Sequence, residues 1–333
     1  MMATTAAPED APQIQAPPQS LALSPWILSA RRFGTVIGLV ALSVALWILT
    51  PHFLTVSNLL NVAEQTSINA VVAVGMTFVI LSAGIDLSVG SIVALAGVAL
   101  GTALQAGHSI GLAVAESLVV GAACGVANGA LISWGRLPPF IVTLGTMSVA
   151  RGAALLYTEG RPVSGFDASF RMIATGRVGF VPASVLATIV IYLVAYVVLT
   201  RTTFGRYVYA IGGNEEATRL AGVPVRLHKT MVYGVSGVAS ALAAIILTAR
   251  LNSAQPIAGM MYELDAIAAT VIGGTSLTGG EGTLGGTLVG ALIMGVLRNG
   301  LNLLGVSSFL QQIVIGAVIV GAVLLDRILK HRD

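Results

Sequence analysis

Long apolar runs, separated by short polar or glycine-rich intervals, make up most of the chain. A helix needs about 20 apolar residues to cross the hydrocarbon core of a bilayer. Runs that approach this length lie near residues 33–50, 60–82, 90–106, 111–134, 139–157, 183–200, 229–250, 263–278, 284–304 and 308–325. The pattern predicts an all-α integral membrane protein, a polytopic helical bundle of about ten transmembrane helices. Because the runs 60–82 and 263–278 are weak or short, the count can change by one.

Composition excludes a soluble globular protein. Of the 333 residues, 56% are hydrophobic and 9% are charged, and the mean hydropathy is +0.90. Soluble domains carry about 25% charged residues, so this chain could not cover a soluble surface. The 39 glycines indicate helices that approach one another closely. The single cysteine, Cys124, excludes an intramolecular disulfide.

The positions of Lys and Arg predict the orientation, because these residues accumulate at the cytoplasmic ends of membrane helices. Arg31, Arg32, Arg136, the loop 201–229 and the basic residues near the C-terminus fall on one side of a ten-helix arrangement. This side is expected to be cytoplasmic, with both termini inside. The loop 158–182 opposes this orientation, since it places three Arg outside.

Three regions follow from this arrangement. Residues 1–30, rich in Pro, Gln and Ala, are predicted to form a disordered cytoplasmic tail. Residues 31–328 form the transmembrane domain, and residues 329–333 form a cytoplasmic C-terminus. Within the membrane domain, residues 52–66 are amphipathic and carry Asn58, Asn61, Glu64 and Gln65.

The polar loop 201–229 is the longest strongly polar interval between apolar runs. Asn214 is a good helix N-cap, and acidic residues in a first helical turn are favoured by the helix dipole. Gly222 and Pro224 can end the helix about two turns later. The sequence predicts a short cytoplasmic helix at 214–221, the alternative being a solvated connector.

Two glycine-rich segments, GIDLSVGS (84–91) and GGTSLTGGEGTLGG (273–286), each combine glycines with Ser or Thr and one acid. Glycine permits a helix to break, and such breaks at membrane depth are tolerated only beside protein or water. Paired, glycine-interrupted segments are typical of transport pathways. The candidate pathway residues are Asp86, Ser88, Gly90, Glu281, Thr283 and Gly285. The alternative is that both acids are ordinary loop residues, with Asp86 capping the next helix.

An internal repeat is visible in two alignments. Residues 68–97 can be laid over 263–292, which places Asp86 opposite Glu281. Residues 120–132 resemble 289–303, with Asn128-Gly129 opposite Asn299-Gly300. Duplication is expected, and the sequence leaves open whether the two halves are inverted. Asn128 and Asn299 are further pathway candidates, the alternative being hydrogen bonds between helices.

The chain lacks the sequence motifs of several kinds of enzyme and transporter. The chain contains only two lysines, Lys229 and Lys330, and neither follows a glycine-rich loop, so no nucleotide-binding P-loop is present. The sequence contains no HExxH motif and no Cys/His cluster, so it predicts no metal site. No series of His or acidic residues follows a span, which weakens a proton-coupled mechanism. We expect no catalytic residue, no cofactor or metal bound by this chain, and no nucleic-acid partner.

The loop 201–229 also carries a family resemblance. Glu216-Ala217-Thr218, followed by Gly222, resembles the EAA motif of ATP-binding-cassette (ABC) importer permeases, with Thr218 in place of Ala. The strings FGRYVYAIGGNEEATRLAGV, GIDLSVGSIVALAG, LPPFIVTLGTMSVARG and IGGTSLTGGEGTLGGTLVGAL resemble the ribose/xylose/galactose permeases of the branched-chain amino-acid/ribose permease superfamily. The resemblance covers residues 33–328.

The resemblance implies a membrane permease that imports a monosaccharide by alternating access and works as a homodimer in the inner membrane. It implies an ABC ATPase subunit, which holds ATP and Mg, and a periplasmic sugar-binding protein. The coupling residues would be Gly205, Arg206, Asn214, Glu215, Glu216, Arg219 and Gly222. The alternatives are a branched-chain amino-acid or other small-solute ABC permease, an ion-coupled secondary transporter, and a non-transporting scaffold.

Overall fold

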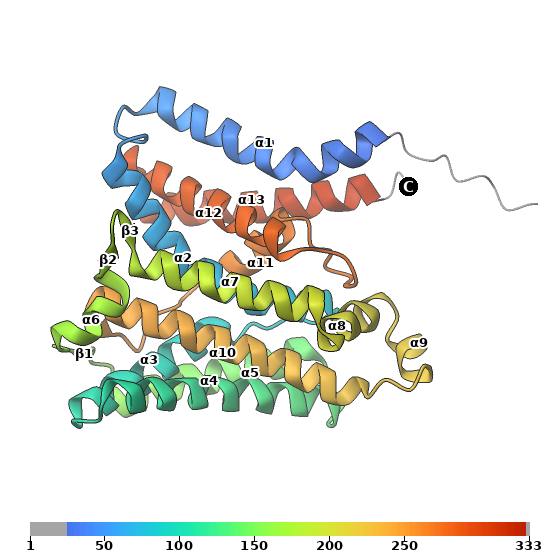
Figure 1. Cartoon of the computed structure of the whole chain (residues 1–333), viewed down its shortest axis with the longest axis horizontal. Helices are drawn as coiled ribbons and strands as arrows, with labels where there is room; N and C mark the ends of the chain where they lie inside the picture. Colours follow the sequence, from blue (N-terminus) through green and yellow to red (C-terminus); the bar gives the residue numbers. More distant parts are fainter. Residues whose placement is uncertain (1–24, 331–333) are drawn as a thin grey trace, which may run out of the picture. The chain divides into compact units, whose positions relative to one another are not determined.

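The computed structural model describes residues 25–330, with the side chains of 25–33, 322 and 325–330 left undescribed (Figure 1). Contacts divide the chain into residues 1–34 and residues 35–333. The first helix begins at Pro25, inside the predicted tail, and Pro suits a first helical turn. The rest of that predicted tail, 1–24, and residues 331–333 lie outside the described residues.

Helices account for most of the described residues (Figure 1). They are α1 (Pro25–Leu49), α2 (Val56–Leu81), α3 (Val89–Gln105), α4 (Ile110–Ser133), α5 (Pro139–Thr158), α6 (Ala168–Thr175), α7 (Ala183–Arg201), α8 (Thr203–Gly213), α9 (Glu215–Leu220), α10 (Val225–Leu251), α11 (Tyr262–Ile272), α12 (Leu284–Leu303) and α13 (Ser308–Lys330). Short strands form two antiparallel pairs, β1 (Val163–Ser164) with β4 (Ser253–Ala254), and β2 (Arg177–Val178) with β3 (Val181–Pro182).

The bundle has two distinct ends, separated by the length of α7 (Figure 1). One end carries α8 and α9, and we call it the α9 end. The other end carries α6 and the strands, and we call it the α6 end. Every element of the predicted polar loops 158–182 and 201–229 therefore lies at one end or the other.

Within the described residues, six helices are long and apolar enough to cross a membrane, namely α2, α4, α5, α7, α10 and α12. Shorter apolar stretches cover 34–49, 89–105 and 308–321. The predicted span 263–278 is wrong in extent, because α11 ends at Ile272. Gly274 adopts φ +88°, a left-handed conformation that ends the helix. A polytopic helical membrane protein is therefore confirmed, whereas the count of about ten spans is not.

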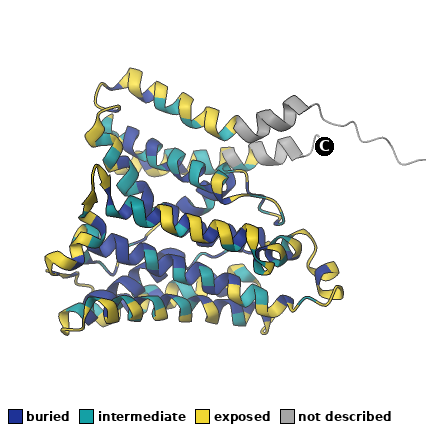
Figure 2. Ribbon diagram, in the orientation of Figure 1, coloured by how far each residue is buried: buried dark blue, intermediate teal, exposed yellow. Residues whose placement is uncertain are grey.

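The helices α2 and α10, the most buried of the long apolar helices (Figure 2), pack against each other in opposite directions. Arg250 near the end of α10 contacts Glu64 near the start of α2, at 3.6 Å between Nε and Oε2. At the other end of the pair, the Tyr233 hydroxyl donates to the carbonyl of Ile85, just beyond α2, at 3.3 Å.

These two helices begin two similar halves. After α2 come a non-helical stretch, α3, α4 and α5; after α10 come a non-helical stretch, α11, α12 and α13. The contacts correspond, because α10 packs on α4 and α3 as α2 packs on α12 and α11. Since α2 and α10 are antiparallel, the two halves are inverted.

The inverted halves decide between the two sequence alignments. Asn128-Gly129 on α4 and Asn299-Gly300 on α12 occupy corresponding helices, as the second alignment places them. The first alignment is wrong, because it pairs α3 with α12, whereas the packing pairs α3 with α11. The counterpart of the break after α2 is the stretch 252–261, not the segment that contains Glu281.

Glycines spaced by four residues explain the close contact of α4 with α10. A Cβ atom at Gly121 or Gly125 of α4 would collide with the backbone of Gly237 or Tyr233 on α10. Gly129 lies one turn further along the same face, against Thr230. Small residues at this spacing allow two backbones to approach in a membrane.

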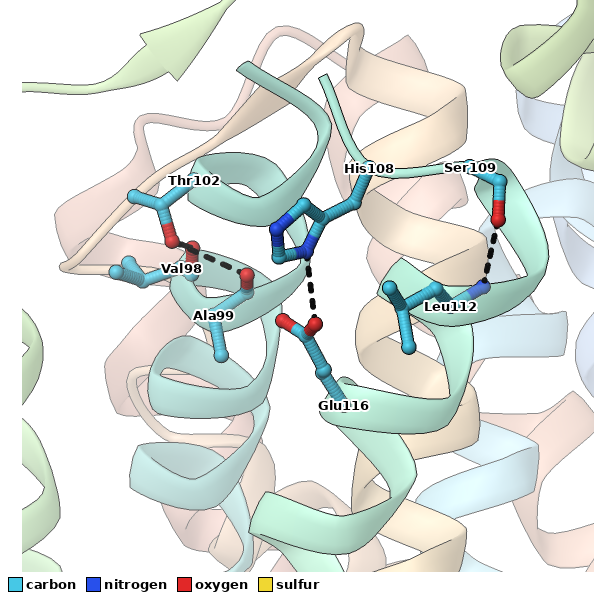
Figure 3. A network of polar contacts seen from close by, with 7 residues as sticks. All are labelled: Val98, Ala99, Thr102, His108, Ser109, Leu112 and Glu116. Carbon is cyan, nitrogen blue, oxygen red and sulfur yellow. Dashed lines mark hydrogen bonds and ion pairs between the residues drawn. The ribbon is translucent and has the colours of Figure 1, made fainter. Parts of the chain in front are cut away.

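The turn between α3 and α4 is fixed by local polar contacts at the α6 end (Figure 3). The Ser109 hydroxyl caps α4 by accepting from the Leu112 amide at 3.4 Å. His108 Nδ1 and the Glu116 carboxylate lie 2.8 Å apart, which ties the turn to the second turn of α4. The Thr102 hydroxyl donates to carbonyls of its own helix.

Candidate functional site: two glycine hinges and the helices beside them

The short helix predicted at 214–221 is present as α9. The Asn214 side chain accepts from the Ala217 amide at 2.9 Å, which is the predicted N-cap. Gly222 adopts φ +83° just beyond the helix, and its amide donates to the Arg219 carbonyl at 3.0 Å. Positive φ carries little cost in Gly, so the helix ends here.

The charged side chains of α9 are exposed to solvent. Glu216 and Arg219 form an ion pair of 2.6 Å on the outer face, and both side chains are more than half exposed. The Glu216 carboxylate raises the pKa of the Arg219 guanidinium. Glu215 instead reaches Lys229 at the start of α10, at 2.9 Å. Because exposed ion pairs contribute little stability, these charges are available to a soluble partner.

A groove of about 650 Å³ lies beside α9. It is lined by α9, the turn between α4 and α5, and the start of α10, and its charged residues are Arg136, Glu215, Glu216, Arg219, Arg226 and Lys229. The Arg226 guanidinium lies 5.6 Å from the centre of the Trp134 ring. The four basic and two acidic side chains give the groove a positive balance, which suits an acidic surface of a partner.

A further helix, α8, was not predicted from the sequence. The Thr202 hydroxyl caps it by accepting from the Gly205 amide at 3.3 Å. Gly205 is buried, and a Cβ atom there would collide with the backbone of Leu199. Gly205 therefore permits the sharp turn between α7 and α8, whereas Arg206 is exposed.

The end of α8 meets the second predicted glycine segment and the end of α2, shortly before the first predicted segment. We call residues 81–88, which are the last residue of α2 and the non-helical stretch after it, the first hinge, and residues 273–283 the second hinge. The Gly280 amide of the second hinge donates to the Leu81 carbonyl, at the start of the first hinge, at 2.9 Å. A Cβ atom at Gly212 of α8 would collide with the Leu81 carbonyl, and one at Gly279 would lie 2.8 Å from the Ala83 amide nitrogen. Gly212, Gly279 and Gly280 thus form a three-way contact, which we call the glycine junction.

Side chains reinforce this contact. The Tyr209 hydroxyl of α8 donates to the Gly282 carbonyl of the second hinge at 2.8 Å. The Phe204 ring of α8 stacks on Phe78 near the end of α2, with 6.1 Å between ring centres. Consequently α8 cannot move without changing its contacts with both hinges.

The first hinge is held by a buried hydrogen-bond network around Asp86. One carboxylate oxygen accepts from the Ser88 amide and hydroxyl at 3.0 and 2.6 Å, and the other accepts from the Ser236 hydroxyl at 2.8 Å. The Asn128 amide donates to the Ser88 hydroxyl at 2.9 Å, and Thr146 donates to Asn128 at 2.5 Å. The network joins the first hinge to α4, α5 and α10. Asp86, Ser88 and Asn128 have no exposed surface in this conformation.

Gly90, the third candidate in this segment, lies where two helix starts meet. A Cβ atom there would collide with the carbonyl of Gly259, shortly before α11. The stretch 252–261 is held in turn by Arg151, which donates to the carbonyls of Pro256 and Ala258 at 2.9 and 2.6 Å. From the sequence, Arg151 could be assigned only to snorkelling or local pairing.

The second hinge has a different construction. Glu281, Thr283 and Gly285 are all exposed, and the Thr283 hydroxyl caps α12 by accepting from the Gly286 amide at 3.1 Å. The hinge is formed by glycines with positive φ instead of by a buried acid. The structure therefore does not bring Glu281 together with Asp86.

Asn299 lies apart from both hinges. It exchanges two hydrogen bonds with Asn58 of α2, at 2.9 and 3.0 Å. In this conformation it joins two helices, which is the alternative that the sequence left open. Within residues 34–324, no group of three or more His, Cys, Asp or Glu side chains could hold a metal ion.

The comparisons with known proteins agree with this architecture. Residues 58–323 match the family described as the permease component of branched-chain amino acid transport systems. The chain belongs to this family, and it is a multi-pass membrane permease.

The relatives are named as sugar permeases. The ribose import permease protein RbsC of Haemophilus influenzae is 48% identical over 266 residues, which cover 79% of this chain and 81% of that protein. RbsC of Bacillus subtilis is 49% identical, covering 77% of this chain and 80% of that protein. The D-allose transport system permease protein AlsC of Escherichia coli is 39% identical, covering 76% and 78%. No solved structure matches the chain significantly. The resemblance found in the sequence is thereby confirmed.

Proposed function

We propose that the chain is the membrane-spanning subunit of an ATP-driven importer, and that it carries a monosaccharide across the inner membrane by alternating access. The names of the relatives support the transport class and the sugar substrate. The family description leaves a branched-chain amino acid as the second candidate. An ion-coupled transporter is disfavoured, since such a protein has no use for an exposed helix with an EAA-like motif.

The partners follow from the two ends of the bundle. We propose that the α9 end is cytoplasmic and meets an ABC ATPase subunit, which supplies ATP and Mg. Its basic residues, among them Arg136, Arg201, Arg206 and Arg226, support this side, since such residues favour the cytoplasm. Both termini would then be cytoplasmic. The α6 end would face a periplasmic sugar-binding protein, and a second copy of the chain would complete a homodimer.

The contact of α8 with both hinges carries this proposal. ATP binding closes the ATPase pair and moves α9 through Asn214, Glu215, Glu216 and Arg219. Gly222 ends α9, while Gly205 and Arg206 direct the approach of α8. Because α8 is packed through Gly212 against both hinges, its movement shifts the first and second hinges together. We propose that this shift opens the pathway that the residues of both hinges shape.

The glycine junction gives the decisive experiment. Gly212→Ala introduces a collision with the Leu81 carbonyl, whereas the neighbouring Gly213→Ala meets no atom within 4 Å. An overpacked contact costs about 1–3 kcal/mol. We expect Gly212→Ala to lower ATP-driven uptake of D-ribose in proteoliposomes about tenfold or more, and Gly213→Ala to keep most of it. Equal uptake by the two variants would remove the junction from the mechanism.

The exposed acid of α9 tests the ATPase contact. We expect Glu216→Lys to weaken association with the ATPase and abolish coupled uptake, because the new charge repels Arg219 and alters the surface offered to the partner. Co-purification of the ATPase and the uptake rate are measured together, with Glu159→Lys at the opposite end as the control. Normal association and uptake in Glu216→Lys would contradict the coupling role.

A further inference from the structure

A row of amide side chains runs along the first half of α2. Asn58, Asn61, Gln65 and Asn69 are three or four residues apart, so they share one face of the helix. We call this row the amide stripe. The sequence shows part of it as the amphipathic segment 52–66, but the stripe continues to Asn69, well inside the apolar run.

Three other helices bring charged groups to the amide stripe. Arg250, at the end of α10, contacts Glu64 at 3.6 Å and donates to Asn61 at 3.4 Å. Arg298 of α12 pairs with Asp265 of α11 at 2.7 Å. Asp265 also accepts from the Asn69 amide at 3.2 Å, so the stripe and both ion pairs form one polar seam.

The seam is partly open. The side chain of Arg298 is 39% exposed, that of Glu64 is 23% exposed and that of Arg250 is 22% exposed. A charged group that faces lipid within a membrane is costly, so such groups face water or protein. The open part of the seam therefore faces an aqueous space or another polar surface.

The charges of the seam are balanced. Each of the two guanidinium groups is paired with one carboxylate, so neither sign is left over. A zwitterionic amino acid would find neither a free cation nor a free anion among these side chains. Amides, by contrast, offer both donors and acceptors, which match the hydroxyl groups of a neutral solute.

Two side-chain oxygens of α2, one in the seam and one beside it, lack partners in the described part of the chain. They are the Asn69 side-chain amide oxygen and the Thr66 hydroxyl, and Thr66 is only 4% exposed. A Cβ atom at Gly295 would collide with the Thr66 hydroxyl, which places this oxygen against α12. Buried polar groups are nearly always paired, so these two atoms, like four others elsewhere in the described residues, are available to accept hydrogen bonds from outside donors.

We infer that the amide stripe, with Arg250 and Arg298, is the wall along which a neutral polyhydroxyl solute passes at the α6 end. When α11 and α12 separate from α2, Asn69 and Thr66 accept hydrogen bonds from the solute hydroxyls. The inference rests on the proposed function and assigns a solute-contacting surface to it.

Cysteine labelling tests whether water reaches the seam and whether the transported solute occupies it. In a Cys124→Ala parent, Asn61→Cys and Gln65→Cys are compared with Leu59→Cys, an exposed apolar position of the same helix. The parent is assembled with its ATPase and binding protein in proteoliposomes. A charged, membrane-impermeant thiol reagent is added from the α6 side. We expect both stripe cysteines to react, D-ribose turnover to slow their reaction, and the Leu59→Cys control to stay unlabelled.

The outcomes separate the inference from the proposed function. Unreactive stripe cysteines in complexes that import D-ribose overturn the inference alone. The same holds for labelling that D-ribose does not slow, because the stripe would then be exposed to water without contacting the solute. Parent complexes without any ATP-dependent uptake overturn both.

Kinetics of Asn69→Ala supply the second measurement. Loss of one hydrogen bond to the solute raises the KM for D-ribose about fivefold, and loss of the hydrogen bond to Asp265 lowers the Tm. A purely structural Asn69 predicts the lower Tm with an unchanged KM. That result would overturn the assignment of Asn69 as a solute contact.

Discussion

The two glycine hinges have similar sequences and different structures. The first hinge keeps its acid, Asp86, fully buried with three hydrogen-bond donors. The second hinge leaves Glu281 exposed and bends through Gly274, Gly279, Gly280 and Gly282, all with positive φ. A glycine cluster with one acid thus specifies a break in a helix, but it does not specify what holds the break.

The two hinges are therefore held in place by different kinds of contact. Side chains from α4, α5 and α10 fix the first hinge, so it can change only if that network rearranges. The second hinge is held through its backbone groups, since the Gly280 amide donates to the Leu81 carbonyl and the Gly282 carbonyl accepts from the Tyr209 hydroxyl. The second hinge therefore lacks the buried carboxylate network that holds the first hinge.

Removal of the two acids should give the largest contrast. Asp86→Ala leaves the hydroxyls of Ser88 and Ser236 without their acceptor, and each buried polar group left unpaired costs about 1–3 kcal/mol. We expect a loss of several-fold in folded yield and a Tm lower by many degrees. Glu281→Ala removes an exposed side chain, and such changes stay within about 0.5 kcal/mol. The Tm of each variant is measured by thermal unfolding in detergent. Equal changes in Tm for Asp86→Ala and Glu281→Ala would contradict the difference between the two hinges.

A methyl group at one glycine beside each hinge should give effects of opposite sign. Gly90→Ala collides with the Gly259 carbonyl, so we expect a cost of about 1–3 kcal/mol. Gly285→Ala meets no atom within 4 Å and lies in the first turn of α12. There, Ala should stabilise the helix by up to about 1 kcal/mol. The Tm values of the two variants are measured in the same detergent. A lower Tm for Gly285→Ala would mean that the start of α12 is packed as tightly as the start of α3.

The sequence predicted those features whose cause lies within a few residues. Asn214 and Gly222 locate α9 almost to the residue, because an N-cap and a left-handed end are local. It did not predict α8, whose glycines look unfavourable for a helix until their contacts with the hinges are seen. The repeat was found, but glycine-rich strings align in more than one register, and only the packing of α10 on α4 selects the correct one.

The asparagines at corresponding places in the two halves should differ least. Asn128→Ala breaks two hydrogen bonds in the buried network, and we expect a cost of about 1–2 kcal/mol. Asn299→Ala breaks its exchange with Asn58, but Asn58 still donates to the Phe53 carbonyl at 2.9 Å. Hydrogen bonds between membrane helices average about 0.6 kcal/mol, so a loss near this value is expected.

A double-mutant cycle sharpens this last comparison. Asn58→Ala with Asn299→Ala should be less destabilising than the sum of the single variants, because both remove the same reciprocal contact. Additive losses in Tm would show that the pair contributes no coupling energy. Since Asn299 would then be free of a structural role, it would return to the set of pathway candidates together with Asn128.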